Sequence, residues 1–282
     1  MISFIARNPD DPSIISRHAF GVYPDKIGEI VLLMERDRIE QYKGAFDKIL
    51  YELKGGVYNG ITGLLADTRI SAIYSKSPAD IADCVSFLGM SRTSCHTIFS
   101  TGSIGGLGVN VEMADLVMAD EAIGNDGYSI FLARREEKPP DYFFDNVIQP
   151  KGNVADLVEE AVQSIAEEFG VQWHRGRIFT TPAVSLETEE LLHKIVDHNC
   201  IAIDMETAPF YAACQEYGFQ SLAIHWVTDL PLTRSFFYRF SGDPKVIQQD
   251  WNKKHPLWLN MPHILVSILR GYIQKKDKFV TP

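Results

Sequence analysis

Two kinds of hydrophobic pattern alternate along the chain. Short runs of apolar and β-branched residues recur without the polar alternation of a strand that faces water. They predict strands buried on both faces at Glu29–Met34, Ile70–Tyr74, Thr97–Thr101, Leu116–Ala119, Arg177–Thr181, Ile201–Asp204 and Ser221–Thr228. Between these runs, apolar residues at helical spacing predict helices at Arg38–Leu53, Pro78–Leu88, Val154–Phe169, Glu187–His198, Thr207–Tyr217 and Lys245–Gln274, the last interrupted near Pro256 and Pro262.

This alternation is typical of an α/β protein, a three-layer α/β/α sandwich with a central mixed sheet. No internal repeat is visible, and the charged, proline-containing stretch Arg134–Asp141 reads as a surface loop. We therefore expect residues 1–282 to form a single domain, with residues 1–28 as an N-terminal extension. Ligands of such sheets usually gather beyond the carboxyl ends of strands, which directs attention to residues 100–107, 204–206 and 228–229.

Charge and cysteine content narrow the classes of partner. The formal net charge is −10, from 27 Lys and Arg against 37 Asp and Glu, whereas a general nucleic-acid binder needs an excess of basic residues. We therefore expect a small-molecule partner and no nucleic acid. The four cysteines have the spacing of neither a disulfide framework nor a zinc site, so no metal or cofactor is predicted. Without a signal peptide or an apolar run of about 18 residues, we expect a cytoplasmic protein that does not bind membranes.

The first strand end, Ser100–Leu107, reads Ser-Thr-Gly-Ser-Ile-Gly-Gly-Leu. Glycines directly after a strand allow backbone N–H groups, such as those of Ser103 and Gly105, to approach an oxygen-rich ligand closely. The alternative is a tight turn without a ligand. The segment is not a P-loop, because no Gly-Lys-Ser/Thr follows.

The other two strand ends carry acids. Glu206 follows Asp204 and Met205 at a strand-to-helix junction. A carboxylate is an acceptor for both hydroxyls of a sugar diol, and Met205 would cover an apolar sugar face; the alternative is a first-turn glutamate favoured by the helix dipole. Asp229 follows Thr228 at the end of the last strand. If partly desolvated, its pKa would rise and it could protonate a leaving base; the alternative is a cap or turn former.

In their order, the Gly-rich segment, Asp-Met-Glu-Thr-Ala and Thr-Asp resemble the nucleoside phosphorylase and nucleosidase superfamily. The likeness runs from about Ile30 to Gly271. It implies that Met205 and Glu206 bind ribose and that Asp229 acts on a purine. It also places Thr228 where a serine usually precedes that acid, and Val184 near the position that packs against the base.

The resemblance implies an enzyme that cleaves the N-glycosidic bond of a nucleoside, which we expect to be a purine nucleoside, or of a 5′-substituted nucleoside. It also implies a nucleoside phosphorylase-like three-layer fold and a homo-oligomer, from dimer to hexamer. In such an oligomer His18 would reach the sugar in a neighbouring subunit; the alternative is an ordinary surface histidine.

The acceptor of the sugar is predicted from departures from the family pattern. Phosphorylases of the family bind phosphate with a Gly-Asp-Pro loop after the first strand and with arginines. Here Met34–Glu40 has neither that glycine nor that proline, Glu40 replaces an arginine and would repel phosphate, and Ser100 replaces another arginine. These changes favour water. Because Met-Glu-Arg-Asp is similar to the Met-Glu-Glu-Glu loop of methylthioadenosine nucleosidases, Asp37 is the candidate general base; the alternative is an N-cap.

Two further segments leave the identity of the substrate undecided. Arg36, with Arg38, could restore a phosphate site or bind a 5′-phosphate, as AMP nucleosidases must. In Thr233–Arg239, Phe236, Phe237 or Tyr238 could cover the 5′ side of the ribose, or the aromatic residues could belong to the core. The alternatives to hydrolysis are a phosphorylase with a remodelled phosphate site and a non-catalytic nucleoside-binding protein.

His225, inside the last strand, is expected to be a core histidine.

Overall fold

One large mixed sheet organises the molecule. The computed structural model describes residues 11–35, 38–75, 77–135, 144–233, 235–236 and 256–280. Within them the eleven-stranded sheet has the order β11-β10-β6-β8-β9-β5-β1-β4-β3-β2, with β7 paired to β6. The strands are β1 (Ile30–Met34), β2 (Lys48–Lys54), β3 (Asn59–Leu65), β4 (Thr68–Tyr74), β5 (Thr97–Gly106), β6 (Leu116–Gly124), β7 (Val147–Ile148), β8 (Trp173–Thr180), β9 (Cys200–Asp204), β10 (Gln220–Leu230) and β11 (Ser235–Phe236).

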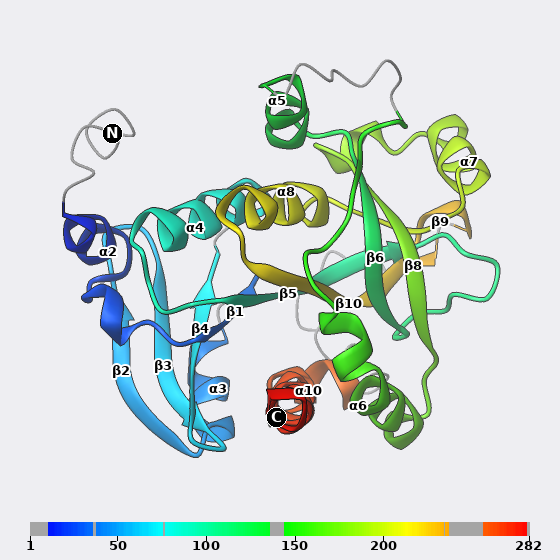
Figure 1. Cartoon of the computed structure of the whole chain (residues 1–282). Coiled ribbons are helices and arrows are strands. Elements are labelled where there is room, and N and C mark those ends of the chain that lie inside the picture. The colour runs from blue at the N-terminus through cyan, green and yellow to red at the C-terminus, as the bar shows by residue number, and fades with distance from the viewer. Residues whose placement is uncertain are drawn as a thin grey trace, which may run out of the picture.

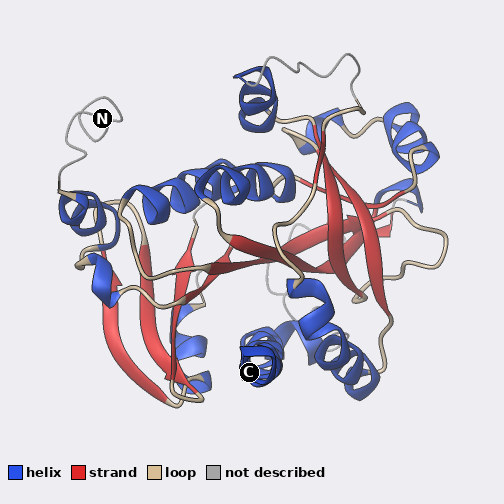
Figure 2. Ribbon diagram, viewed as in Figure 1, coloured by secondary structure: helices blue, strands red, loops and turns tan. Residues whose placement is uncertain are grey.

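Helices cover both faces of this sheet, which confirms the predicted three-layer α/β/α fold (Figure 1). The described α-helices are α2 (Pro12–Phe20), α3 (Ile39–Ala45), α4 (Pro78–Met90), α5 (Gly127–Arg135), α6 (Val154–Phe169), α7 (Glu189–Asp197), α8 (Thr207–Tyr217) and α10 (Pro256–Val280). One face is covered by α4 and α8, and the other by α3, α6 and α10 (Figure 2). Among the described residues, no helix is long and apolar enough to cross a membrane.

Strand β5 belongs both to the open part of the sheet, through β1, and to a closed part. Its first residues pair in parallel with both β1 and β10, and its last two, Gly105 and Gly106, pair with β9. Since β10 also pairs with β6, β6 with β8 and β8 with β9, these five strands form a closed ring. The Gly-rich segment is therefore not a turn after a strand but the second half of β5. A Cβ atom at Gly106 would lie 2.8 Å from Cγ1 of Val111, so glycine permits this close packing.

Two of the predicted helices are wrong in part. The predicted helix Arg38–Leu53 ends at Ala45, and its second half is strand β2, which forms an antiparallel pair with β3. Apolar residues at Ile49, Tyr51 and Leu53 have the period of two that a strand requires, and that period overrode the helical pattern. Helix α10 begins at Pro256 and continues through Pro262 without the predicted interruption. Residues 245–255 lie outside the described part.

The N-terminal region adds a helix that the hydrophobic pattern did not predict. Asp11 caps α2 by accepting a hydrogen bond from Ser13 N (3.0 Å), Pro12 occupies the first turn, and Gly21 ends the helix with φ 75°. Phe20 is buried and its ring stacks on Tyr58, with 5.7 Å between centroids. Part of the expected N-terminal extension thus belongs to the core.

Candidate active site

A cavity of about 750 Å³ lies where β5, β9 and β10 end. Seven predicted site residues line it: Ser103, Gly105, Val184, Met205, Glu206, Thr228 and Asp229. Their segments are far apart in the sequence, and the closed ring of strands brings them together. Arg36, Asp37 and Phe237 lie outside the described residues. His18 lies in α2 and is not among the residues that line this cavity.

Glu206 stands at the junction between β9 and α8, and its carboxylate does not cap the helix. That role belongs to Asp204, whose Oδ2 accepts a hydrogen bond from Thr207 N (2.9 Å). Glu206 is buried and accepts a hydrogen bond from Met205 N (2.9 Å). Because Asp204 caps the helix, the Glu206 side chain is left to line the cavity.

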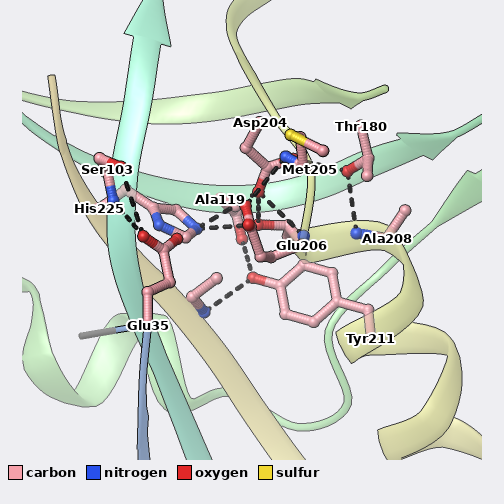
Figure 3. Close-up of polar contacts among 12 residues, drawn as sticks. Glu35, Ser103, Ala119, Thr180, Asp204, Met205, Glu206, Ala208, Tyr211 and His225 are labelled. Atoms are coloured by element: carbon pink, nitrogen blue, oxygen red, sulfur yellow. Dashed lines mark hydrogen bonds and ion pairs between the residues drawn. The ribbon is translucent and has the colours of Figure 1, made fainter. Parts of the chain in front are cut away.

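Glu35 is a site residue that the sequence analysis missed. It follows β1 directly, and its Oε2 accepts hydrogen bonds from Ser103 N (3.1 Å) and Ser103 Oγ (3.3 Å) (Figure 3). Burial raises the pKa of Glu206 well above its ordinary value, and the nearby carboxylates of Glu35 and Asp204 raise it further. The Glu35 and Glu206 carboxyl groups therefore form a pair that retains a proton more readily than two separated acids would.

The pairing of strands explains how Glu35 reaches Ser103. Met34 lies opposite Thr101 in the parallel pair of β1 and β5, so the residue after β1 comes beside Gly102 and Ser103. A Cβ atom at Gly102 would overlap the Glu35 carboxylate. The glycine of the segment is therefore required for the approach of a carboxylate from the same chain, where the sequence analysis had expected the approach of a ligand.

A buried network holds Asp204 beneath the cavity. Its Oδ1 accepts a hydrogen bond from Thr180 Oγ1 (2.7 Å), and Thr207 Oγ1 lies 2.8 Å from His225 Nε2 (Figure 3). Burial lowers the pKa of His225 although the charge of Asp204 opposes this, so the imidazole is neutral at pH 7. His225 is completely buried, as expected for a core histidine.

A second pair of acids consists of Asp229 and Glu187. Oδ1 of Asp229 accepts a hydrogen bond from Thr228 Oγ1 (2.9 Å), and burial raises the pKa of Asp229 above its ordinary value. Burial also raises the pKa of Glu187 to about 7, with a further contribution from the charge of Asp229. Both side chains line the cavity. One or both of these acids can therefore hold a proton near neutral pH, as a group that protonates a leaving base must.

The described lining of the cavity is acidic. It contains five carboxyl groups and, among the described residues, no Lys, Arg or His; the acids are Glu187, Glu189, Asp204, Glu206 and Asp229. Such a lining stabilises positive charge and repels anions. Arg38 is not part of it: its guanidinium lies 5.9 Å from the ring centroid of Trp226. Within the described chain, no cluster of three His, Cys, Asp or Glu side chains is arranged to hold a metal ion.

The starts of two helices differ from the prediction. Helix α3 begins at Ile39 with Arg38 at its N-cap position, and the predicted alternative role of Asp37 as an N-cap lies outside the described residues. Helix α7 begins at Glu189 with Thr188 as its N-cap, so Glu187 precedes the helix in which its acidic side chain was expected. Thr188 Oγ1 accepts the capping hydrogen bond from Leu191 N (3.3 Å). The Glu187 side chain is thereby placed in the connection that leads from β8 to α7.

Comparisons with known proteins agree on one family. A family model described as the phosphorylase superfamily matches residues 29–239. A DeoD-type purine nucleoside phosphorylase of Buchnera aphidicola is 39% identical over 66 residues, only 23% of this chain and 28% of that protein. Another, from Roseobacter denitrificans, is 23% identical over 217 residues, 74% of this chain and 85% of that protein.

A solved structure has the same fold. It is the 5′-methylthioadenosine/S-adenosylhomocysteine nucleosidase of Neisseria meningitidis in complex with methylthio-immucillin-A, 16% identical, with a TM-score of 0.64. The superposition covers 86% of this chain and 98% of that one. At this identity the likeness concerns the fold.

Proposed function

Since the chain belongs to the phosphorylase superfamily and is thus an enzyme of nucleoside chemistry, we propose that it hydrolyses the N-glycosidic bond of a purine nucleoside or 5′-substituted nucleoside. One observation carries the proposal. Two pairs of acids, Glu35 with Glu206 and Asp229 with Glu187, lie in or beside one cavity whose described lining has no basic residue. Hydrolysis of this bond needs acids for two different tasks, at the base and at the sugar.

The reaction follows from the chemistry of these groups. As the bond between C1′ and the base nitrogen breaks, its electron pair leaves with the base and the sugar becomes oxocarbenium-like. Asp229 donates a proton to the base, for which its raised pKa suits it. Glu206 accepts hydrogen bonds from the ribose diol, and the negative charge that the Glu35–Glu206 pair keeps stabilises the positive sugar. The oxygen of water forms the new bond to C1′, and a carboxylate accepts the proton that water loses.

Two carboxylates are candidates for the group that accepts this proton. Asp37 is the candidate from the family pattern and lies outside the described residues. Glu35 is the candidate from position, because it contacts Ser103 and its charge acts on Glu206. Replacing each by its amide, Glu35→Gln and Asp37→Asn, separates them: the variant of the true base loses hydrolysis by about 100-fold or more, and the other retains most of it.

The other predicted site residues keep their roles as proposals. Met205 and Val184 would contact sugar and base, and Thr228 would orient Asp229. Ser103 and Gly105 would approach the ligand through β5. Phe237 would cover the 5′ side, Arg36 would meet an anionic 5′ substituent, and His18 would act in a neighbouring subunit. A homo-oligomer and a cytoplasmic location complete the proposal.

Phosphorolysis is the second candidate, because the curated relatives are phosphorylases. The acidic lining opposes it, since phosphate would enter a field of like charge. Incubation of the protein with adenosine, inosine, guanosine, uridine, methylthioadenosine and AMP, with and without phosphate, distinguishes the two. A hydrolase releases free ribose in both conditions, whereas a phosphorylase forms ribose 1-phosphate only when phosphate is present.

The variants Glu206→Gln and Asp229→Asn test the assignment of roles. We expect each to lose base release by about 100-fold or more while remaining folded. Undiminished turnover in both would refute the proposal. Tight nucleoside binding without base release, measured by calorimetry beside chromatography of the products, would identify a non-catalytic binding protein instead.

A further inference from the structure

Glu187 lines the cavity, yet neither the sugar nor the departing proton requires it. It lies directly after the 3-10 turn Val184–Leu186, and its backbone N–H donates a hydrogen bond to the carbonyl oxygen of Val184 (3.0 Å). The two side chains therefore belong to one closed turn. Both side chains also line the cavity, so with Val184 against the face of a base we expect Glu187 at the edge of that base.

The neighbour of Glu187 indicates which edge. The charge of Asp229 acts on Glu187, and both side chains line the same cavity. The proposed function, on which this inference rests, assigns Asp229 to protonate the departing base. In a purine nucleoside the sugar is on N9, so N7 is the free nitrogen of the same ring and the position that we expect to take this proton. In a purine, N7 and the substituent on C6 lie side by side on the same edge, with an amino donor in adenine and an oxo acceptor in guanine.

We propose that Glu187 recognises the substituent on C6 of the purine and discriminates 6-amino from 6-oxo bases. As a carboxylate it accepts a hydrogen bond from a 6-amino group, and as a protonated acid it donates one to a 6-oxo group. A single side chain then serves two classes of base in its two protonation states.

The surroundings of Glu187 allow both states near neutral pH. Asp229 faces it from β10, Glu189 belongs to α7, and Asp204 and Glu206 line the cavity from the β9–α8 junction. These described groups are all acids, so none of them favours the ionised form of Glu187. With its pKa at about 7, Glu187 changes from mostly protonated to mostly ionised across the physiological range.

The test measures kcat/KM for adenosine and for inosine between about pH 5.5 and about pH 8, because kcat/KM follows ionisations of the free enzyme. Ionisations of Asp229, Glu35 and Glu206 affect both substrates alike and cancel in the ratio of the two values. We expect the ratio of adenosine to inosine to rise about tenfold with pH, equivalent to about 1.4 kcal/mol, with a midpoint near 7.

Two variants complete the experiment. Glu187→Gln has an amide that both donates and accepts without titrating, so we expect a ratio that does not depend on pH. Glu190→Gln is the matched control, because Glu190 is exposed, does not line the cavity and pairs with Lys194 (2.7 Å); we expect it to keep the slope of the unchanged protein.

The outcomes separate this inference from the function on which it rests. Two results overturn the inference alone while base release continues. In the first, the ratio of kcat/KM for adenosine to that for inosine does not change with pH in the unchanged protein. In the second, this ratio changes with pH in Glu187→Gln as much as in the unchanged protein. Absence of base release from both nucleosides overturns the proposed function and the inference with it. The affinities for adenine and for hypoxanthine, measured by calorimetry, test the same discrimination without turnover. A rise with pH in the ratio of the affinity for adenine to that for hypoxanthine supports the inference.

Discussion

Replacement of Gly102 by alanine tests the position of Glu35 without touching its carboxylate. A Cβ atom at Gly102 would overlap the carboxylate of Glu35, and the three atoms nearest to it all belong to that side chain. Because the far end of a flexible side chain can move while a strand cannot, Glu35 rotates away and β5 remains in place. The variant then lacks the hydrogen bonds from Ser103 to Glu35, and the charge of Glu35 no longer acts on Glu206.

The magnitude follows from these losses. Two hydrogen bonds to a charged group stabilise the protein by about 1.5–3 kcal/mol each, and water compensates much of this when the carboxylate moves into the cavity. Alanine in place of glycine in a strand returns about 0.5–1 kcal/mol. We therefore expect a decrease of about 1–2 kcal/mol in the free energy of unfolding. The loss of a positioned general base or its partner reduces base release by about 100-fold or more.

The assay combines thermal unfolding with chromatography of the released base. Gly44→Ala is the matched control, because a Cβ atom at Gly44 in helix α3 has no neighbour within 4 Å. We expect that control to retain full base release and to gain about 0.5–1 kcal/mol of stability. A folded Gly102→Ala protein with undiminished base release would refute the assignment of Glu35 to the active site.

Three further predictions concern stability and positioning. Burial raises the pKa of Glu187 from its ordinary value of 4.5 to about 7 in the folded protein. The folded state therefore binds more protons than the unfolded state between these values, and the stability of the protein falls as pH rises through this range. Glu187→Gln should therefore stabilise the protein by about 2 kcal/mol at about pH 8 and have little effect at about pH 4, as measured by urea unfolding. The expected gain is smaller than the full pKa shift implies, because the side chain is partly in water. Thr180→Val removes a donor to Asp204 (2.7 Å) and an acceptor for Ala208 N (3.0 Å); we expect a loss of about 1–3 kcal/mol and a reduced kcat, and an unchanged stability would contradict the role of this network. Tyr211→Phe leaves the carbonyl of Ala119 and the N–H of Ala223 without the buried Tyr211 hydroxyl, so we expect a loss of about 2 kcal/mol with catalysis nearly unchanged, which chemical unfolding and base release together would measure.

The hydrophobic pattern predicts helices and strands that have clear ends in the sequence, and it fails where only pairing with distant strands decides the structure of a segment. Helices α6 and α8 have the predicted bounds, because each has a clear end at a glycine with positive φ, Gly170 after α6 and Gly218 after α8. Strand β3 was not predicted, since Asn59, Gly60 and Gly63 weaken its apolar pattern and only its pairing with β2 and β4 makes it a strand. Such pairing is a tertiary effect that a single sequence does not display.

The residues of the candidate site were likewise predicted only in part. Glu206 and Asp229 were predicted because each lies within two residues of the end of an apolar run in the sequence, so that its position near a strand end is local information. Glu35 also follows a strand, but its contact with Ser103 depends on the pairing of β1 with β5 and on the missing side chain at Gly102. Glu187 appeared to be the first residue of a helix, where an acid is common; only the N-cap at Thr188 places it outside that helix.

The closed ring of strands divides the substrate's recognition between two kinds of scaffold. The acids assigned to the ribose and to the departing proton stand at the ends of β9 and β10, within strands that are paired on both sides. The groups assigned to the base, Val184 and Glu187, stand in a short connection outside the ring. Residues 181–188 are therefore the place where an engineer could exchange base preference by replacing one connection, while the machinery that breaks the bond keeps its frame.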